Sequence, residues 1–218
     1  SAALCTNTLE TIQTELDLRE VVSEGQASYQ TLTSPAFGEV GSVRVFKGDT
    51  IEELIYVGIT VPQIHLDSHM LFAFTREGSA VPHFTLDSVA VPDGYAFHLD
   101  LIPRLDLGAN LAYMDEAFGP LTSIFDEAET IEGLTKAHIS QRQAALMSPW
   151  MLVHRATADA FDNIAAPVGA YLKHWLGLVQ RGITTSATEA ELAKRNAANR
   201  SAIFNPDVDP VWHRIEKL

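Results

Sequence analysis

PHFTLDSVAVPDGYAFHLDLI, residues 82–102, alternates between polar and apolar positions on both sides of the turn Pro92-Asp93-Gly94. Alternation with period two is typical of β-strands, and so short a turn joins only antiparallel neighbours. The same period extends upstream to about residue 29. It predicts an antiparallel sheet over about residues 29–102, with strands at Ser42–Phe46, Glu53–Thr60, Gln63–Thr75, Pro82–Val91 and Gly94–Leu101.

Helical periodicity flanks this block of strands. Upstream, Leu9, Ile12 and Leu16 predict a helix over Asn7–Glu24. Downstream, the C-terminal helices are expected within about residues 110–198, at Asn110–Ala117, Leu121–Glu127, Ser140–Leu146, Thr157–Gln180 and Thr188–Ala198. Pro167 should kink or divide the fourth of these, because proline removes a helix hydrogen-bond donor. Residues 199–218 are expected to form an extended tail.

A single block of strands between helical blocks indicates an α+β fold in which helices cover an antiparallel sheet. We find no internal repeat and no low-complexity linker, so residues 1–218 are predicted to form one domain.

The composition narrows the classes of partner. The chain of 218 residues has 15 basic and 28 acidic residues, a net charge of −13, which disfavours binding to nucleic acid or to an anionic membrane. Its single cysteine, Cys5, excludes an internal disulfide and a cysteine-based metal site. No apolar run reaches the roughly 18 to 20 residues of a membrane span, and no signal-peptide pattern opens the sequence. We therefore expect a cytoplasmic protein; the oligomeric state is not predicted.

Asp87 is the candidate acid. Strand alternation places His83 and Asp87 on one face, and His98 and Asp100 together on one face of the next strand. Burial of a carboxylate in an apolar environment raises its pKa, which suits a proton donor near neutral pH. The alternative, an aspartate in water at the edge of the sheet, stays open.

A second pattern, His65, Asp67 and His69, has ligand types that bind zinc or iron. On one strand the three residues extend over roughly 13 Å, so they bind a single ion only if the strand bends. A solvated strand face is the alternative. The sequence has no motif of a phosphate-binding loop, a dinucleotide-binding turn or a serine nucleophile elbow.

Several segments resemble one known group of enzymes. They are Ser79–Ser88, Ala96–Leu107, Ser148–Arg155 and Phe161–Leu176. Together they resemble the red chlorophyll catabolite reductase and ferredoxin-dependent bilin reductase superfamily, over roughly residues 40–180.

The resemblance implies a three-layer α/β/α sandwich that holds an open-chain tetrapyrrole between the sheet and the C-terminal helices. It implies a reductase with no bound flavin, metal or nicotinamide, to which ferredoxin supplies single electrons. Asp87 matches the family's central-strand aspartate, the proton donor. Asp162 matches a carboxylate on the C-terminal helix that faces the substrate from the other side.

The resemblance also suggests substrate-binding residues. Arg104 and Arg155 are candidates for binding the propionates, because a guanidinium binds a carboxylate with two hydrogen bonds; surface arginines are the alternative. His83, His69, Phe72 and Phe97 complete the set, although aromatic residues at such positions also form ordinary core. One departure concerns a histidine of some bilin reductases. It aligns near Met70, and His69 points to the opposite face in a regular strand.

The charge raises a question about the electron donor. Ferredoxin is acidic, so a chain of net charge −13 needs a local basic patch to bind it. Candidate residues for this patch, or else ordinary solvated charges, are Lys173, Arg181, Lys194, Arg195 and Arg200. Two other functions stay open: a tetrapyrrole carrier without catalysis, and a metal-dependent enzyme that uses His65, Asp67 and His69.

Overall fold

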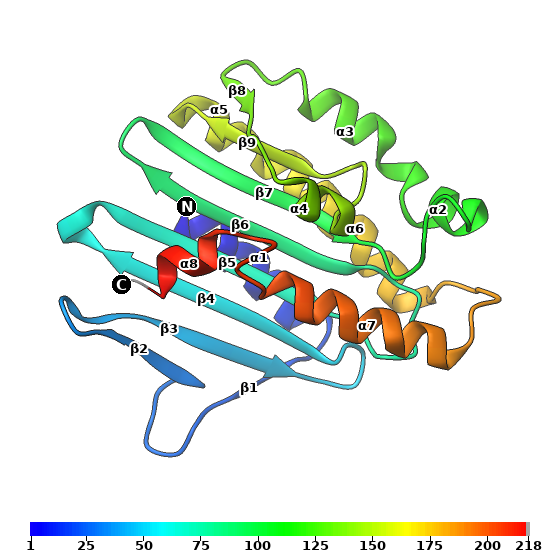
Figure 1. Cartoon of the computed structure of the whole chain (residues 1–218), viewed down its shortest axis with the longest axis horizontal. Helices are drawn as coiled ribbons and strands as arrows, with labels where there is room; N and C mark the ends of the chain where they lie inside the picture. Colours follow the sequence, from blue (N-terminus) through cyan, green and yellow to red (C-terminus); the bar gives the residue numbers. More distant parts are fainter. Residues whose placement is uncertain (217–218) are drawn as a thin grey trace.

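One antiparallel sheet organises the chain (Figure 1). The computed structural model describes residues 1–216, without the side chain of residue 214. In this part of the chain the strand order is β1-β3-β4-β5-β6-β7-β9-β8, and β2 also pairs with β3. The strands are β1 (Arg19–Val21), β2 (Gln30–Ser34), β3 (Gly38–Lys47), β4 (Glu53–Val61), β5 (Leu66–Phe74), β6 (His83–Val91), β7 (Gly94–Ile102), β8 (Leu134–Lys136) and β9 (Leu152–Ala156).

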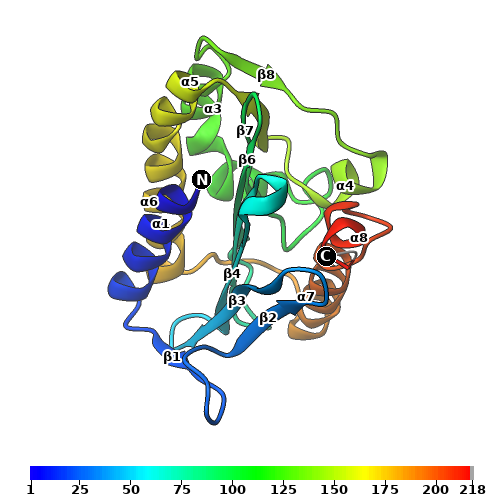
Figure 2. The same cartoon turned by 90° about the vertical axis from the view of Figure 1, so that its left-hand side faces the viewer.

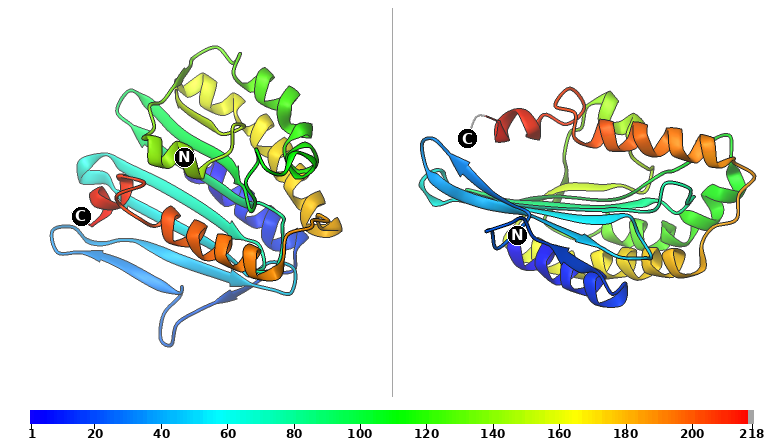
Figure 3. Two further views of the ribbon diagram at one scale, coloured as in Figure 1. Left: turned by 45° about the vertical axis from the view of Figure 1, so that its right-hand side comes forward. Right: turned by 90° about the horizontal axis from the view of Figure 1, so that it is seen from below.

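Helices cover both faces of the sheet. They are α1 (Ala2–Glu15), α2 (Leu111–Ala117), α3 (Thr122–Ala128), α4 (Gln141–Leu146), α5 (Ala158–Asn163), α6 (Ala165–Arg181), α7 (Glu189–Ile203) and α8 (Val211–Ile215), with short 3₁₀ turns η1 (Pro62–Ile64) and η2 (Gly119–Leu121). Helices α1 and α6 lie on one side, which we call the α1–α6 face (Figure 2). Helices α7 and α8 lie on the other, the α7–α8 face (Figure 3). The expected α/β/α sandwich is confirmed.

Strand alternation divides the core between the two faces. Phe84 and Leu86 of β6 belong to the hydrophobic cluster of the α1–α6 face, where Phe84 contacts the fully buried Trp175 of α6. Met70 and Phe72 of β5 belong to a second cluster on the α7–α8 face. The sheet is apolar on both faces because both are covered.

Several boundaries differ from the sequence predictions. The first helix ends at Glu15 rather than Glu24, because Asp17 adopts a left-handed conformation (φ 47°) that turns the chain into β1. The predicted helix over Thr157–Gln180 is divided at Ile164 into α5 and α6, as expected from Pro167.

Three further elements were not predicted as the structure has them. β8 and β9 are too short to show a clear period in the sequence. The tail predicted as extended from residue 199 begins with the last turn of α7 and ends with α8. None of the described helices combines the length and the apolar character that crossing a bilayer requires.

Candidate functional site

A cavity of about 530 Å³ opens on the α7–α8 face, and we call it the sheet cavity. Strands β5 to β7 and β9 form its base, and the β8–α4 connection and the C-terminal segment (residues 204–216) border it. Its lining includes Met70, Asp87, His98, Val153 and Ile215. Its volume falls within the range typical of small-molecule sites.

Asp87 and His98 form the polar pair at the base of the cavity. They lie directly opposite each other on β6 and β7, and Nδ1 of His98 is 3.3 Å from Oδ1 of Asp87. The Asp87 side chain is 29% exposed and that of His98 is 10% exposed. Burial lowers the pKa of His98, but Asp87, with smaller contributions from Asp100 and Asp209, outweighs burial and raises it. The pair can therefore hold a proton beside the cavity.

Asp100 is the carboxyl group that burial perturbs most clearly. It is fully buried, and it accepts hydrogen bonds from the backbone N–H of Ser148 (2.9 Å) and from its hydroxyl (2.5 Å). Burial raises its pKa to about 6, although the charge of His98 and the bonds from Ser148 act in the opposite direction. The sequence placed Asp100 on this face but did not show that the loop at Ser148 covers it.

Asp209 is a site residue that the sequence analysis missed. It borders both the sheet cavity and a small cavity of about 20 Å³ beneath the C-terminal segment, and Asp87 and His98 line both of these cavities as well. Its carboxylate accepts a hydrogen bond from the N–H of Val211 at the start of α8 (3.0 Å). No local sequence pattern relates the turn at Asp209 to the sheet, because its position beside the cavity depends on the path of the chain after α7.

Two of the predicted substrate-binding residues lie on the cavity face. Phe72 lines the small cavity, where its ring contacts Phe204 and Trp212. Arg155 is exposed on β9, directly opposite Ala96, which lines the sheet cavity. Arg155 therefore lies next to a lining residue on the cavity face, although it is not itself one of the residues that line the cavity.

Asp162 is not part of this site. It is exposed on α5, and α5 packs on the α1–α6 face through Phe161, whose ring stacks on Tyr95 at 4.1 Å. The prediction failed because α5 and α6 cover the α1–α6 face, whereas the cavity opens on the α7–α8 face. Asp87 and Asp162 lie on opposite sides of the sheet.

Arg104 and His83 are structural rather than accessible to a ligand. The fully buried Arg104 donates to the hydroxyl of Thr75 (2.8 Å) and to the backbone carbonyls of Arg76, Glu77 and Leu192 (3.1, 2.7 and 3.2 Å). Burial lowers its pKa to about 10. His83 is also fully buried, and its Nδ1 accepts the N–H of Thr75 (3.1 Å). Both predictions were wrong because these residues connect the β5–β6 loop to the core.

His69 and Phe97 direct their side chains to the α1–α6 face, although Phe97 also borders the sheet cavity. His69 lies on the α1–α6 face, with Nδ1 2.6 Å from the hydroxyl of Tyr56 and Nε2 2.8 Å from Asp67. The Phe97 ring belongs to the core of that same face. Period-two alternation is the reason, because each residue is one position away from a residue that faces the cavity: Met70 and His98.

The structure contradicts the metal-binding alternative. His65 follows η1 in a left-handed conformation (φ 53°) and lines the sheet cavity, whereas Asp67 and His69 bond to each other on the opposite face. Within residues 1–216, no three His, Cys, Asp or Glu side chains are grouped so that they can hold a metal ion.

The five basic residues predicted as a patch do not gather on one surface. Lys173 and Arg181 belong to α6 and the other three to α7, on opposite faces of the sheet (Figure 2). Arg181 pairs with Glu116 at 3.9 Å, and Arg200 pairs with Glu53 and lies over the ring of Phe74.

Comparisons with known proteins show a relation at the level of structure. No protein-family model and no curated protein matches the sequence. Among solved structures, phytochromobilin synthase from tomato, solved in complex with biliverdin, matches with a TM-score of 0.76 and 18% identity. The match covers 100% of this chain and 76% of that protein. The two chains share one fold.

Proposed function

We propose that this protein is a ferredoxin-dependent reductase of an open-chain tetrapyrrole. The observation that carries the proposal is the sheet cavity, in which Asp87 lies at the base of an otherwise largely apolar lining. The shared fold with a protein solved with biliverdin supports it. A flat conjugated diacid needs an apolar cavity, a proton donor near the rings and a cation at the rim, and we assign the last two roles to Asp87 and Arg155.

In the proposed reaction, reduced ferredoxin gives the bound pigment one electron at a time. The O–H bond of protonated Asp87 then breaks while a new C–H or N–H bond forms on the pigment, so each electron is matched by a proton. The apolar lining keeps water away from the one-electron-reduced pigment. We assign the second carboxylate of the site to Asp209 in place of Asp162, because Asp209 borders the same cavity. Arg155 binds a propionate at the rim.

The test starts with pigment binding. Purified protein is titrated with biliverdin while the visible band is followed, and reduced ferredoxin is then added without oxygen. We expect wild type to bind and reduce the pigment. Asp87→Asn should bind it equally but reduce it about 100-fold more slowly or worse, because the amide has no acidic proton to give.

Asp162→Asn is the matched control, since Asp162 is exposed on the other side of the sheet; it should reduce the pigment at the wild-type rate. Equal turnover by wild type and Asp87→Asn would refute the assignment of Asp87. If wild type binds the pigment but fails to reduce it with any electron donor, the protein is a carrier.

A further inference from the structure

His98 is the titratable side chain that lies across from Asp87 on a neighbouring strand. On its other side Asp87 pairs in register with Met70 of β5, which has no titratable group. Nδ1 of His98 on β7 lies 3.3 Å from Oδ1 of Asp87. Both members of the pair line the sheet cavity and the small cavity. His98 therefore contacts the proposed proton donor at the place where the pigment is expected.

Three carboxyl groups act on this imidazole. Asp87 faces it from β6, Asp100 lies two residues along β7, and Asp209 acts on it from the turn before α8. Its register partner on β9, Val153, is apolar. Three acids around one base favour an imidazole that carries a proton.

The second ring nitrogen of His98 is also placed for proton exchange. Nε2 is buried and has no hydrogen-bond partner within the described residues. The adjoining small cavity, about 20 Å³ in volume, has room for one water molecule, and its lining includes the polar groups of Thr85 and Asp209. A protonated His98 therefore has its Nδ1–H directed at Asp87 and its Nε2–H buried beside the small cavity.

We propose that His98 is a positioning residue that holds the Asp87 carboxyl and returns a proton to it during turnover, a role that rests on the proposed function. After Asp87 has given its proton to the pigment, the Nδ1–H bond of the imidazolium breaks and the O–H bond of Asp87 forms again. No electron moves in this step. The neutral imidazole regains its proton from water once the product has left the cavity.

The first test changes His98 to glutamine, which keeps a hydrogen-bond donor but cannot supply a proton at neutral pH. With biliverdin and reduced ferredoxin, we expect His98→Gln to bind the pigment like wild type. Its kcat should fall about 10- to 100-fold, as for other residues that act through a partner. Wild-type turnover should decrease as pH rises through the pKa of His98, and the variant should lack this pH dependence.

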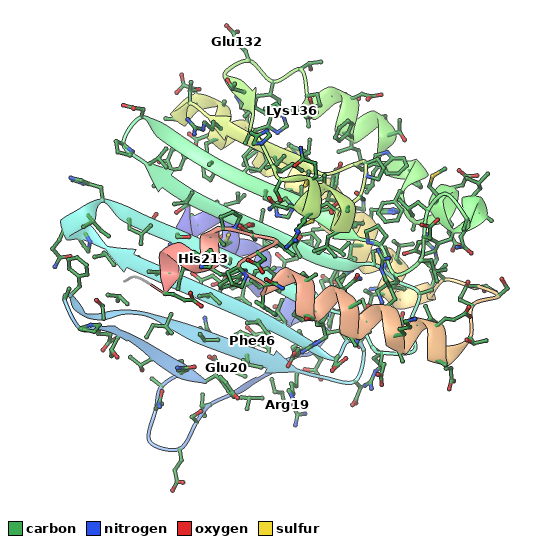
Figure 4. The ribbon with its side chains drawn as sticks, in the orientation of Figure 1. Arg19, Glu20, Phe46, Glu132, Lys136 and His213 are labelled. Carbon is green, nitrogen blue, oxygen red and sulfur yellow. The ribbon has the colours of Figure 1, made fainter. Side chains whose placement is uncertain are left out.

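His213→Gln is the matched control, because His213 lies exposed on α8, is not among the residues that line either cavity, and pairs with Glu216 (Figure 4). It should keep the wild-type rate and pH profile. A wild-type pH profile in His98→Gln would overturn the proposal. If wild type itself fails to reduce the pigment, the proposed function is overturned, and the role of His98 with it. If wild type is active and His98→Gln has the same pH profile, only the role of His98 is overturned.

A second measurement does not depend on turnover or on the folding of His98→Gln. The imidazole of His98 is titrated by NMR in wild type and in Asp87→Asn. We expect the pKa of His98 to be lower in Asp87→Asn, because the charge that raises it has been removed. An unchanged pKa would show that the two groups do not share a proton, and would overturn the proposal.

Discussion

At the scale of single residues, the site separates two acids that the sequence placed on one face. Asp87 is partly exposed to the cavity, whereas Asp100 is fully buried under Ser148. The sequence argument, that burial raises the pKa of a carboxyl group, applies to Asp100. Asp87 reaches the cavity instead, so the two residues of one strand pair differ: we propose proton transfer for Asp87, whereas Asp100 attaches the loop at Ser148.

Asp100→Asn should change how stability depends on pH. The pKa of Asp100 is about 6 in the folded protein against an ordinary value of 3.8. Because the folded value is raised, the folded state holds this proton more tightly, and the stability it contributes is lost as pH rises from about 4 to above 6. A pKa difference of about two units corresponds to roughly 3 kcal/mol of the free energy of unfolding at most. Asparagine has no such proton and still bonds Ser148.

The measurement is chemical denaturation of wild type and Asp100→Asn at pH 4.5 and at pH 7. We expect the variant to gain stability relative to wild type at the higher pH. A difference between the two proteins that stays constant across this range would show that Asp100 does not titrate as the structure indicates.

At the scale of elements, long periodic segments were predictable and short ones were not. β6 begins at His83 and β7 ends at Ile102, each within one residue of the predicted strand boundary. β9 has five residues, too few to show a period, and it is recognisable only through its pairing with β7. The same limit explains the site: Asp87 follows from alternation within a strand, whereas Asp209 follows from the packing of distant segments.

Thr188→Ala tests the N-terminal cap of α7. The hydroxyl of Thr188 accepts the N–H of Glu191, and the carboxylate of Glu191 accepts the N–H of Thr188 in return (2.8 Å). Loss of this capping box should reduce the free energy of unfolding by about 1 kcal/mol. Denaturant titration measures it. Thr11→Ala, an exposed position within α1, should change stability much less, and equal losses in both variants would contradict the assignment.

At the scale of the whole molecule, the sheet separates two environments. The α1–α6 face is closed by a continuous core, which contains the wholly buried Trp175. The α7–α8 face is covered less completely, and the sheet cavity lies there beside the C-terminal segment. We therefore place the proposed ligand site on the less completely covered face of the sheet, where Trp212 packs against the hydrophobic cluster of that face.

Trp212→Ala tests whether the C-terminal segment helps to retain the pigment. The Trp212 ring lies against Phe72 and Phe204, and its Nε1 donates to the carbonyl of Ile203 (2.7 Å). Without this anchor we expect Asp209 to lose its position and the Kd for biliverdin to rise about tenfold, equivalent to about 1.4 kcal/mol. Fluorescence or absorbance titration measures the Kd. An unchanged Kd would show that the segment does not contribute to binding.

Met70, Asp87 and His98 come from three successive strands joined by hairpin connections, so all of the base of the cavity except the part from β9 is encoded in one uninterrupted stretch, residues 66–102. Exchange of that stretch between related genes would transfer Asp87 and His98 together, while the helices on either side stayed unchanged. Within such a lineage, new reaction chemistry can arise by recombination at the two ends of this stretch, and does not require coordinated mutations throughout the gene.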